Sequence, residues 1–97
     1  ASDVYKRQEY IWFMETKQPY APPIGDNPYY LGKHNSTGYY FYYEPQRVTV
    51  LDYAFLSTIT EKADGTVIYA DRCSISEDKL AKMGITFKKI PRDISRL

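Results

Sequence analysis

The side chains with the clearest chemical potential are basic and lie near the end of the chain. They are Lys88, Lys89, Arg92 and Arg96. Positive side chains at this density are typical of a surface that meets a polyanion or an acidic protein. In a strand, Lys88 and Lys89 would point to opposite faces, so at most one lies beside the arginines. A helical turn begun by Pro91 would place Arg92 and Arg96 on one side. We predict phosphate contacts from these four residues.

The distribution of charges along the chain indicates a basic C-terminal segment, which the net charge alone does not reveal. The net charge is only +1. Residues 51–78 carry six acidic and two basic side chains, a net charge of −4, whereas residues 79–97 carry six basic and one acidic, a net charge of +5. Two solvated faces of opposite sign are the alternative explanation.

The segment Asn27-Pro28-Tyr29-Tyr30 is similar to the Asp/Asn/Ser-Pro-Pro-Tyr/Phe motif of amino-methyltransferases, which holds a flipped base. Here Tyr29 replaces the second proline, no apolar strand precedes the motif, and no Phe-x-Gly-x-Gly cofactor loop accompanies it. We therefore favour a turn in a proline-rich loop, and we predict no catalytic residue.

Three other single residues could carry chemistry. His34 is the only histidine and Cys73 the only cysteine, and without paired spacing they predict no metal site. We expect His34 in a surface loop and Cys73 as a small buried residue between a strand and a helix. Asp71 ends a predicted parallel strand, where α/β sheets place ligand-contacting groups. A cap or turn role is the favoured alternative for Asp71.

The aromatic run Tyr39–Tyr43 could form a base-stacking platform for single-stranded nucleic acid. Such platforms usually interleave basic residues, and this run has none. Strand alternation also sends the rings to both faces. We favour a strand between two apolar surfaces.

The elements expected in the first half are few. Residues 1–8 resemble a translated sequencing adaptor, so we expect them to be a non-native scar and the natural product to extend upstream. Residues 9–16 form a near-continuous apolar run that predicts a strand buried on both faces, or a strand that belongs to a larger sheet. Residues 17–38 hold four prolines and three glycines, which predict a long irregular loop with a short extended piece at residues 29–31. The scar and residues 9–37 would precede an α/β module over residues 38–97.

That module is expected to begin with a strand over residues 39–44. A capping box at residues 49–52 then predicts a helix with apolar residues to Ala63, ended by a left-handed cap at Gly65.

The remaining elements are a strand over residues 66–71, a helix over 76–83 opened by a capping box at residue 74 and ended by Gly84, and a strand over 85–90. Because a helix joins the last two strands, they should be parallel with a right-handed crossover. The predicted fold class is α/β: a small mixed sheet with a C-terminal β-α-β unit and one preceding helix, part of a larger fold.

Length and composition set further bounds. A chain of 97 residues has room for one small domain. The single cysteine forms no internal disulfide and fits a reducing compartment, so we expect a cytoplasmic protein. No apolar run approaches the roughly 20 residues that span a bilayer.

Residues 38–97 resemble the C-terminal end of the modification subunit of type III restriction–modification systems, which are site-specific adenine DNA methyltransferases. The most specific parts are Val67–Asp71 and Phe87–Ile94. The resemblance implies DNA and the restriction subunit as partners and S-adenosylmethionine as the cofactor of the parent enzyme. The family's cofactor loop and Asp-Pro-Pro-Tyr motif lie far upstream of this region, so no catalytic residue or cofactor is expected here. The alternative is a small independent interaction protein, for example a phage-borne inhibitor.

Overall fold

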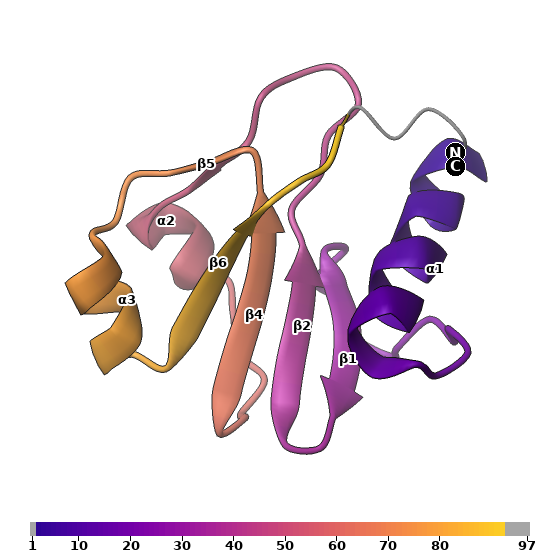
Figure 1. Ribbon diagram of the computed structural model, residues 1–97, viewed down its shortest axis with the longest axis horizontal. Helices are drawn as coiled ribbons and strands as arrows, with labels where there is room; N and C mark the ends of the chain where they lie inside the picture. The colour runs from indigo at the N-terminus through magenta and orange to yellow at the C-terminus, as the bar shows by residue number, and fades with distance from the viewer. Residues whose placement is uncertain (1, 93–97) are drawn as a thin grey trace.

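The computed structural model, which describes residues 2–92, has one mixed sheet with helices on both faces (Figure 1). Its strands are β1 (Tyr30–His34), β2 (Thr37–Phe41), β4 (Gly65–Ala70) and β6 (Ile85–Lys89), and they lie in the order β1-β2-β4-β6. β1 and β2 are antiparallel, whereas β2–β4 and β4–β6 are parallel. The predicted fold class and the parallel pairing of the last two strands are confirmed.

A second, two-stranded parallel sheet consists of β3 (Val50–Leu51) and β5 (Arg72–Cys73). The helices are α1 (Ser2–Thr16), α2 (Tyr53–Leu56) and α3 (Glu77–Lys82).

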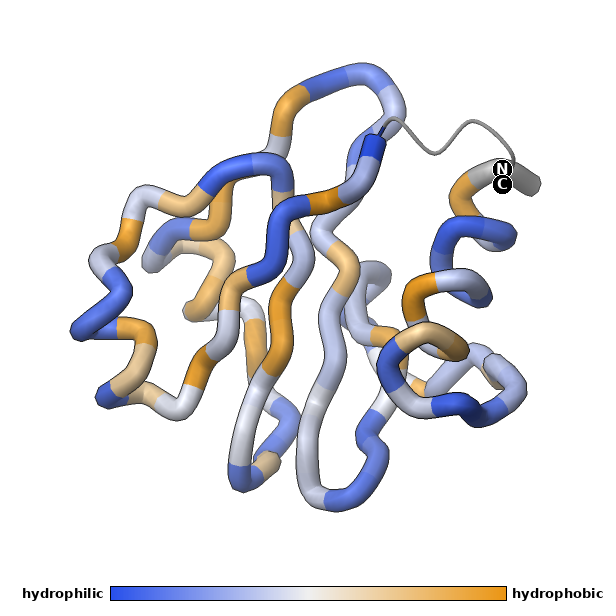
Figure 2. The backbone as a smooth tube through the Cα atoms, in the orientation of Figure 1, coloured by the Kyte–Doolittle hydropathy of each residue, from blue (hydrophilic) through white to orange (hydrophobic). Residues whose placement is uncertain are grey.

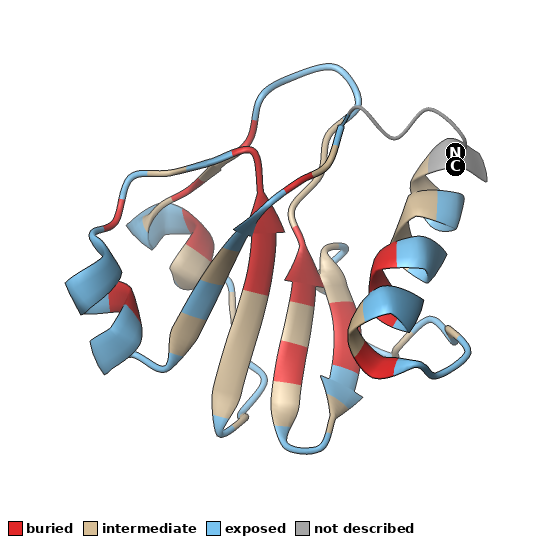
Figure 3. Ribbon diagram, viewed as in Figure 1, coloured by how far each residue is buried: buried red, intermediate tan, exposed pale blue. Residues whose placement is uncertain are grey.

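The sheet separates two apolar clusters. On one face, Tyr40 and Ile68 pack against Phe55 of α2 and Leu80 of α3. On the other face, Phe41 and Tyr69 belong to the cluster that contains Ile11 and Trp12 of α1. Buried residues therefore concentrate along β2 and β4, the two inner strands (Figure 3).

The prediction of a strand over residues 9–16 is wrong, because these residues form the second half of α1. The helix begins at Ser2, so it also includes most of the expected scar, whose origin stays a prediction. Lys17 (φ 59°) lies in the left-handed region, where its amide donates to the Phe13 carbonyl (2.8 Å) and ends the helix. Trp12 packs on β1 at Gly32, where an added Cβ would lie 3.0 Å from the indole.

The predicted loop over residues 17–38 is wrong at its end. β1 and the start of β2 form a hairpin there, joined by Asn35 (φ 49°) and Ser36 (φ 67°). Two successive left-handed residues match the twist of the flanking strands. β2 begins and ends earlier than the strand expected over residues 39–44.

The helix expected after residue 52 is much shorter than predicted. Asp52, rather than Thr49, is its N-cap, and its carboxylate accepts from the Phe55 amide (2.8 Å). The hydroxyls of Ser57 and Thr58 donate to carbonyls three residues back (both 2.7 Å), which competes with helix continuation.

The residues that begin and end the later elements differ in part from the predicted ones. Ser76, not Ser74, caps α3. Gly65 begins β4 instead of ending a helix. Gly84 follows the end of α3, as predicted, and its backbone (φ 70°) lies in the left-handed region. Over residues 2–92, no helix is long and apolar enough to cross a membrane.

Candidate functional site

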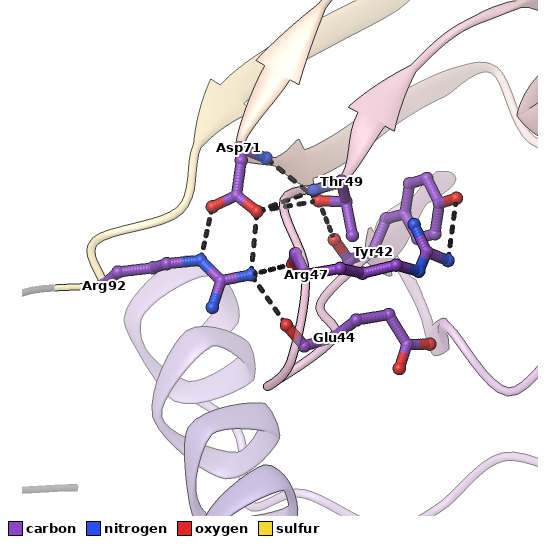
Figure 4. Close-up of polar contacts among 6 residues, drawn as sticks. All are labelled: Tyr42, Glu44, Arg47, Thr49, Asp71 and Arg92. Carbon is purple, nitrogen blue, oxygen red and sulfur yellow. Dashed lines mark hydrogen bonds and ion pairs between the residues drawn. The ribbon is translucent and has the colours of Figure 1, made fainter.

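The carboxyl edge of the parallel strands holds the most extensive polar network of the described chain (Figure 4). Asp71 directly follows β4, and Arg92 lies three residues beyond β6. The Arg92 guanidinium donates twice to the Asp71 carboxylate, from Nε to Oδ1 (2.6 Å) and from Nη2 to Oδ2 (2.8 Å). The strand order that brings β4 beside β6 makes this pair possible.

Thr49 completes the surroundings of Asp71. The Thr49 amide donates to the Asp71 carboxylate (2.8 Å), and the Asp71 amide donates to the Thr49 hydroxyl (3.1 Å). That hydroxyl in turn donates to the Tyr42 carbonyl (2.7 Å). Thr49 therefore links the segment after β2 to the end of β4. Asp71 holds a turn together, as the favoured alternative stated, but through an ion pair in which Asp71 is buried and Arg92 is partly exposed.

Arg92 also ties the loop after β2 to this edge. Its Nη2 lies 2.8 Å from the carbonyl oxygens of Glu44 and Arg47, and its guanidinium lies 4.6 Å from the centre of the Tyr43 ring. We call this arrangement of Asp71, Thr49 and Arg92 with the loop carbonyls the Arg92 clamp. The hydrogen bonds from Arg92 lower the pKa of Asp71 to about 2, against burial, and those from Thr49 add to the effect.

The clamp predicts a specific loss of stability in acid. The pKa of Asp71 is about 2 in the folded chain and near 3.8 without these partners. Because the folded value is the lower one, the stabilisation is present above about pH 5 and disappears as the pH falls toward about 2. A shift of this size corresponds to about 2 kcal/mol, after allowance for the partial exposure of Arg92.

Urea unfolding of the chain at about pH 6 and pH 3, followed by circular dichroism, checks this expectation. In Asp71→Asn the difference between the free energies of unfolding at the two pH values should shrink by about 1 kcal/mol, because at pH 3 only about half of the stabilisation has been lost. An equal pH dependence in both proteins would show that other carboxylates cause the loss.

Lys88, like Arg92 a predicted phosphate contact, also has a partner within the chain. Its Nζ lies 2.6 Å from the Glu15 carboxylate on α1, which also accepts from the Tyr69 hydroxyl (2.5 Å). Burial opposes ionisation of Glu15, but the hydrogen bonds from Lys88 and Tyr69 outweigh it and lower its pKa. The Lys88 side chain remains 44% exposed.

The four predicted basic residues therefore do not form one surface in the described chain. The side chain of Lys89, an exposed residue, makes no hydrogen bond or ion pair with any residue from 2 to 92. Strand alternation places it on the face opposite Lys88. Arg96, and the helical turn expected with Arg92, lie outside the described residues. Figure 2 shows that the end of β6 is hydrophilic, whereas the first part of this strand includes hydrophobic residues.

A second candidate site is an aromatic cavity of about 620 Å³. The segment Asn27-Pro28-Tyr29-Tyr30 forms part of its wall, together with Phe55 of α2. Sequence reasoning treated this segment as a turn and missed the cavity. The one available signal was the period-two spacing of Tyr40 and Tyr42, which favours one shared face.

The remaining candidates have structural surroundings. Cys73 is half-buried in β5, and its thiol donates to the Ile75 carbonyl (3.4 Å). His34 ends β1 and is half-buried, instead of lying in the expected surface loop. In the part of the chain that the structure describes, no three His, Cys, Asp or Glu residues lie together as metal ligands.

Comparisons of this chain with protein-family models, curated proteins and solved structures found no match.

Proposed function

We propose that this chain is the C-terminal module of the modification subunit of a type III restriction–modification system, a DNA adenine methyltransferase. The resemblance of residues 38–97 supports this proposal. The module has no part in methyl transfer, and S-adenosylmethionine belongs to the parent enzyme. Its task is accessory: it contacts the restriction subunit or the rest of the modification subunit more than it contacts DNA.

The internal ion pairs of the basic residues are the observation that favours a role in subunit assembly over a role in DNA binding. Lys88 is paired with Glu15 and Arg92 with Asp71. A phosphate would have to displace a carboxylate at each position. Of the described candidates, Lys89 alone is available without such a displacement.

The outer surface of α1 favours a protein contact. Tyr10, Phe13 and Met14, which follow the expected scar, are exposed there, and Phe13 is 55% exposed. Large exposed apolar side chains gathered on one element are typical of interaction surfaces. The same observation supports the second candidate function, an independent interaction protein with an aromatic docking surface.

A binding experiment with two charge-reversal variants tests the proposal. We expect Lys88→Glu and Lys89→Glu each to change the affinity of the chain for duplex DNA by less than about twofold, with little change in salt dependence. Fluorescence anisotropy with labelled DNA at several salt concentrations measures both. Uniformly weaker binding, with a salt slope shallower by about one unit per variant, would assign these lysines to DNA instead.

Binding to a purified type III restriction subunit, followed by biolayer interferometry, provides the second arm. Phe13→Glu should abolish this binding and Lys89→Glu should leave it unchanged. Absence of binding by the unmodified chain to either subunit of such a system would favour the independent interaction protein.

A further inference from the structure

We propose that the aromatic cavity is a binding site for an organic cation carrying an alkylammonium or guanidinium group. The proposed function makes no use of this cavity, so each proposal can be disproved without affecting the other. Its walls come from the segment before β1, from β2 and from the region of α2. Its volume, about 620 Å³, lies in the range of small-molecule sites.

The walls offer an unusual density of aromatic rings. Tyr42 and Phe55 stack with centroids 4.3 Å apart, and Tyr29 meets Tyr42 edge-on at 4.8 Å. Tyr30 and Tyr40 lie 5.0 Å apart in a tilted pair. Ring faces attract cations through their quadrupole, and several rings around one site form the cages that bind quaternary ammonium groups.

The charged side chains that line the cavity all have the sign that a cation needs. Its lining includes the carboxylates Asp26, Asp52 and Glu61. None of the described residues that line it is Lys, Arg or His. An anionic ligand would meet three like charges here, whereas a cation would meet three opposite ones.

Tyr40 supplies an independent indication of a ligand. Its residue is only 2% exposed, yet no residue of the described chain hydrogen-bonds to its hydroxyl. The hydroxyl oxygen itself is not fully buried and Tyr40 lines the cavity, so a ligand can reach it. Burial, with smaller contributions from Tyr30 and Glu61, raises the pKa of Tyr40 to about 12, so the hydroxyl stays neutral and its lone pairs can accept from an N–H group.

The chain already places one cation against the same aromatic cluster. The Arg47 guanidinium lies 5.6 Å from the centre of the Tyr42 ring and donates to the Tyr42 hydroxyl (3.4 Å). Arg47 does not line the cavity. It shows that a guanidinium fits these rings from the flank, which leaves the cavity itself for an external group.

Titration of the ¹⁵N-labelled full chain by NMR tests the proposal, with tetramethylammonium and methylguanidinium as probes. Both should give saturable shifts at amides around the cavity, whereas tert-butanol, a neutral molecule of similar shape to tetramethylammonium, should give none. Glu61→Gln should weaken both cations about threefold. Asp78→Asn, an exposed change on α3, should leave both unchanged.

A second variant separates a hydrogen-bonding role from packing. Tyr40→Phe should weaken methylguanidinium about fivefold and tetramethylammonium, which has no N–H group, much less. The same titration with an arginine-containing peptide distinguishes the sources: tighter binding than methylguanidinium supports a partner polypeptide, and equal binding supports a free small cation. No saturable shift with either cation, equal shifts with tert-butanol, or binding of adenosine in place of the cations would overturn the proposal.

Discussion

Replacing Asp71 by Ala is expected to lower the free energy of unfolding by about 3 kcal/mol. The Asp71 side chain is only 9% exposed and receives hydrogen bonds from the Arg92 guanidinium and the Thr49 amide. Its removal leaves the buried Thr49 amide without its acceptor and the partly exposed Arg92 guanidinium without its counter-charge, and an unpaired buried donor is costly. Urea unfolding followed by circular dichroism measures the change.

Lys88→Ala is the matched control for this prediction. It also breaks an ion pair on the same sheet, but its side chain is 44% exposed, so the expected loss is below about 1 kcal/mol. A double-mutant cycle of Asp71→Ala with Arg92→Ala isolates the energy of the pair. If Asp71→Ala costs no more than Lys88→Ala, the Arg92 clamp contributes little to stability.

Trp12→Ala is the second change with a large expected effect, a loss of about 3 to 4 kcal/mol. Trp12 is 8% exposed, packs on Gly32 and Tyr39 of the sheet, and donates from its indole N–H to the Pro19 carbonyl (3.2 Å). Its loss would leave a cavity between α1 and the sheet. Thermal and urea unfolding check the magnitude.

Phe13→Ala, at the next position of the same helix, should cost less than about 0.5 kcal/mol because Phe13 is exposed. The pair of variants also tests the helical assignment of this segment. In a strand buried on both faces, neighbouring residues would contribute similarly. Comparable losses for Trp12→Ala and Phe13→Ala would therefore contradict the packing of α1.

The second half of the fold could be predicted because its signals are local. The β-branched run of β4 and the glycine after α3 act within a few residues of their own positions. The same approach was wrong for α1 for two reasons. Setting residues 1–8 aside removed many of its good helix formers, and the exposed Phe13 and Met14 beside buried Ile11 hide the helical period.

The sites depend on distances that a sequence does not contain. Asp71 and Arg92 are 21 positions apart, and they meet because each follows one of two neighbouring parallel strands. That much could have been inferred from the predicted β-α-β unit, since parallel strands end at the same edge. The aromatic cavity could not, because its walls come from three separate segments whose packing no local pattern specifies.

The two internal ion pairs also decide how the basic segment acts on a charged molecule that is still far away. Lys88 and Arg92 each hold an opposite charge within 2.6 Å, so at long range each pair behaves as a small dipole and not as a positive charge. The potential of a dipole falls off faster than that of a single charge, and physiological salt screens what is left over about 8 Å. Long-range steering, which can raise association rates by orders of magnitude, gains little from these two residues. A polyanion would reach this edge of the sheet by ordinary diffusion, and the two residues would act on it only after contact.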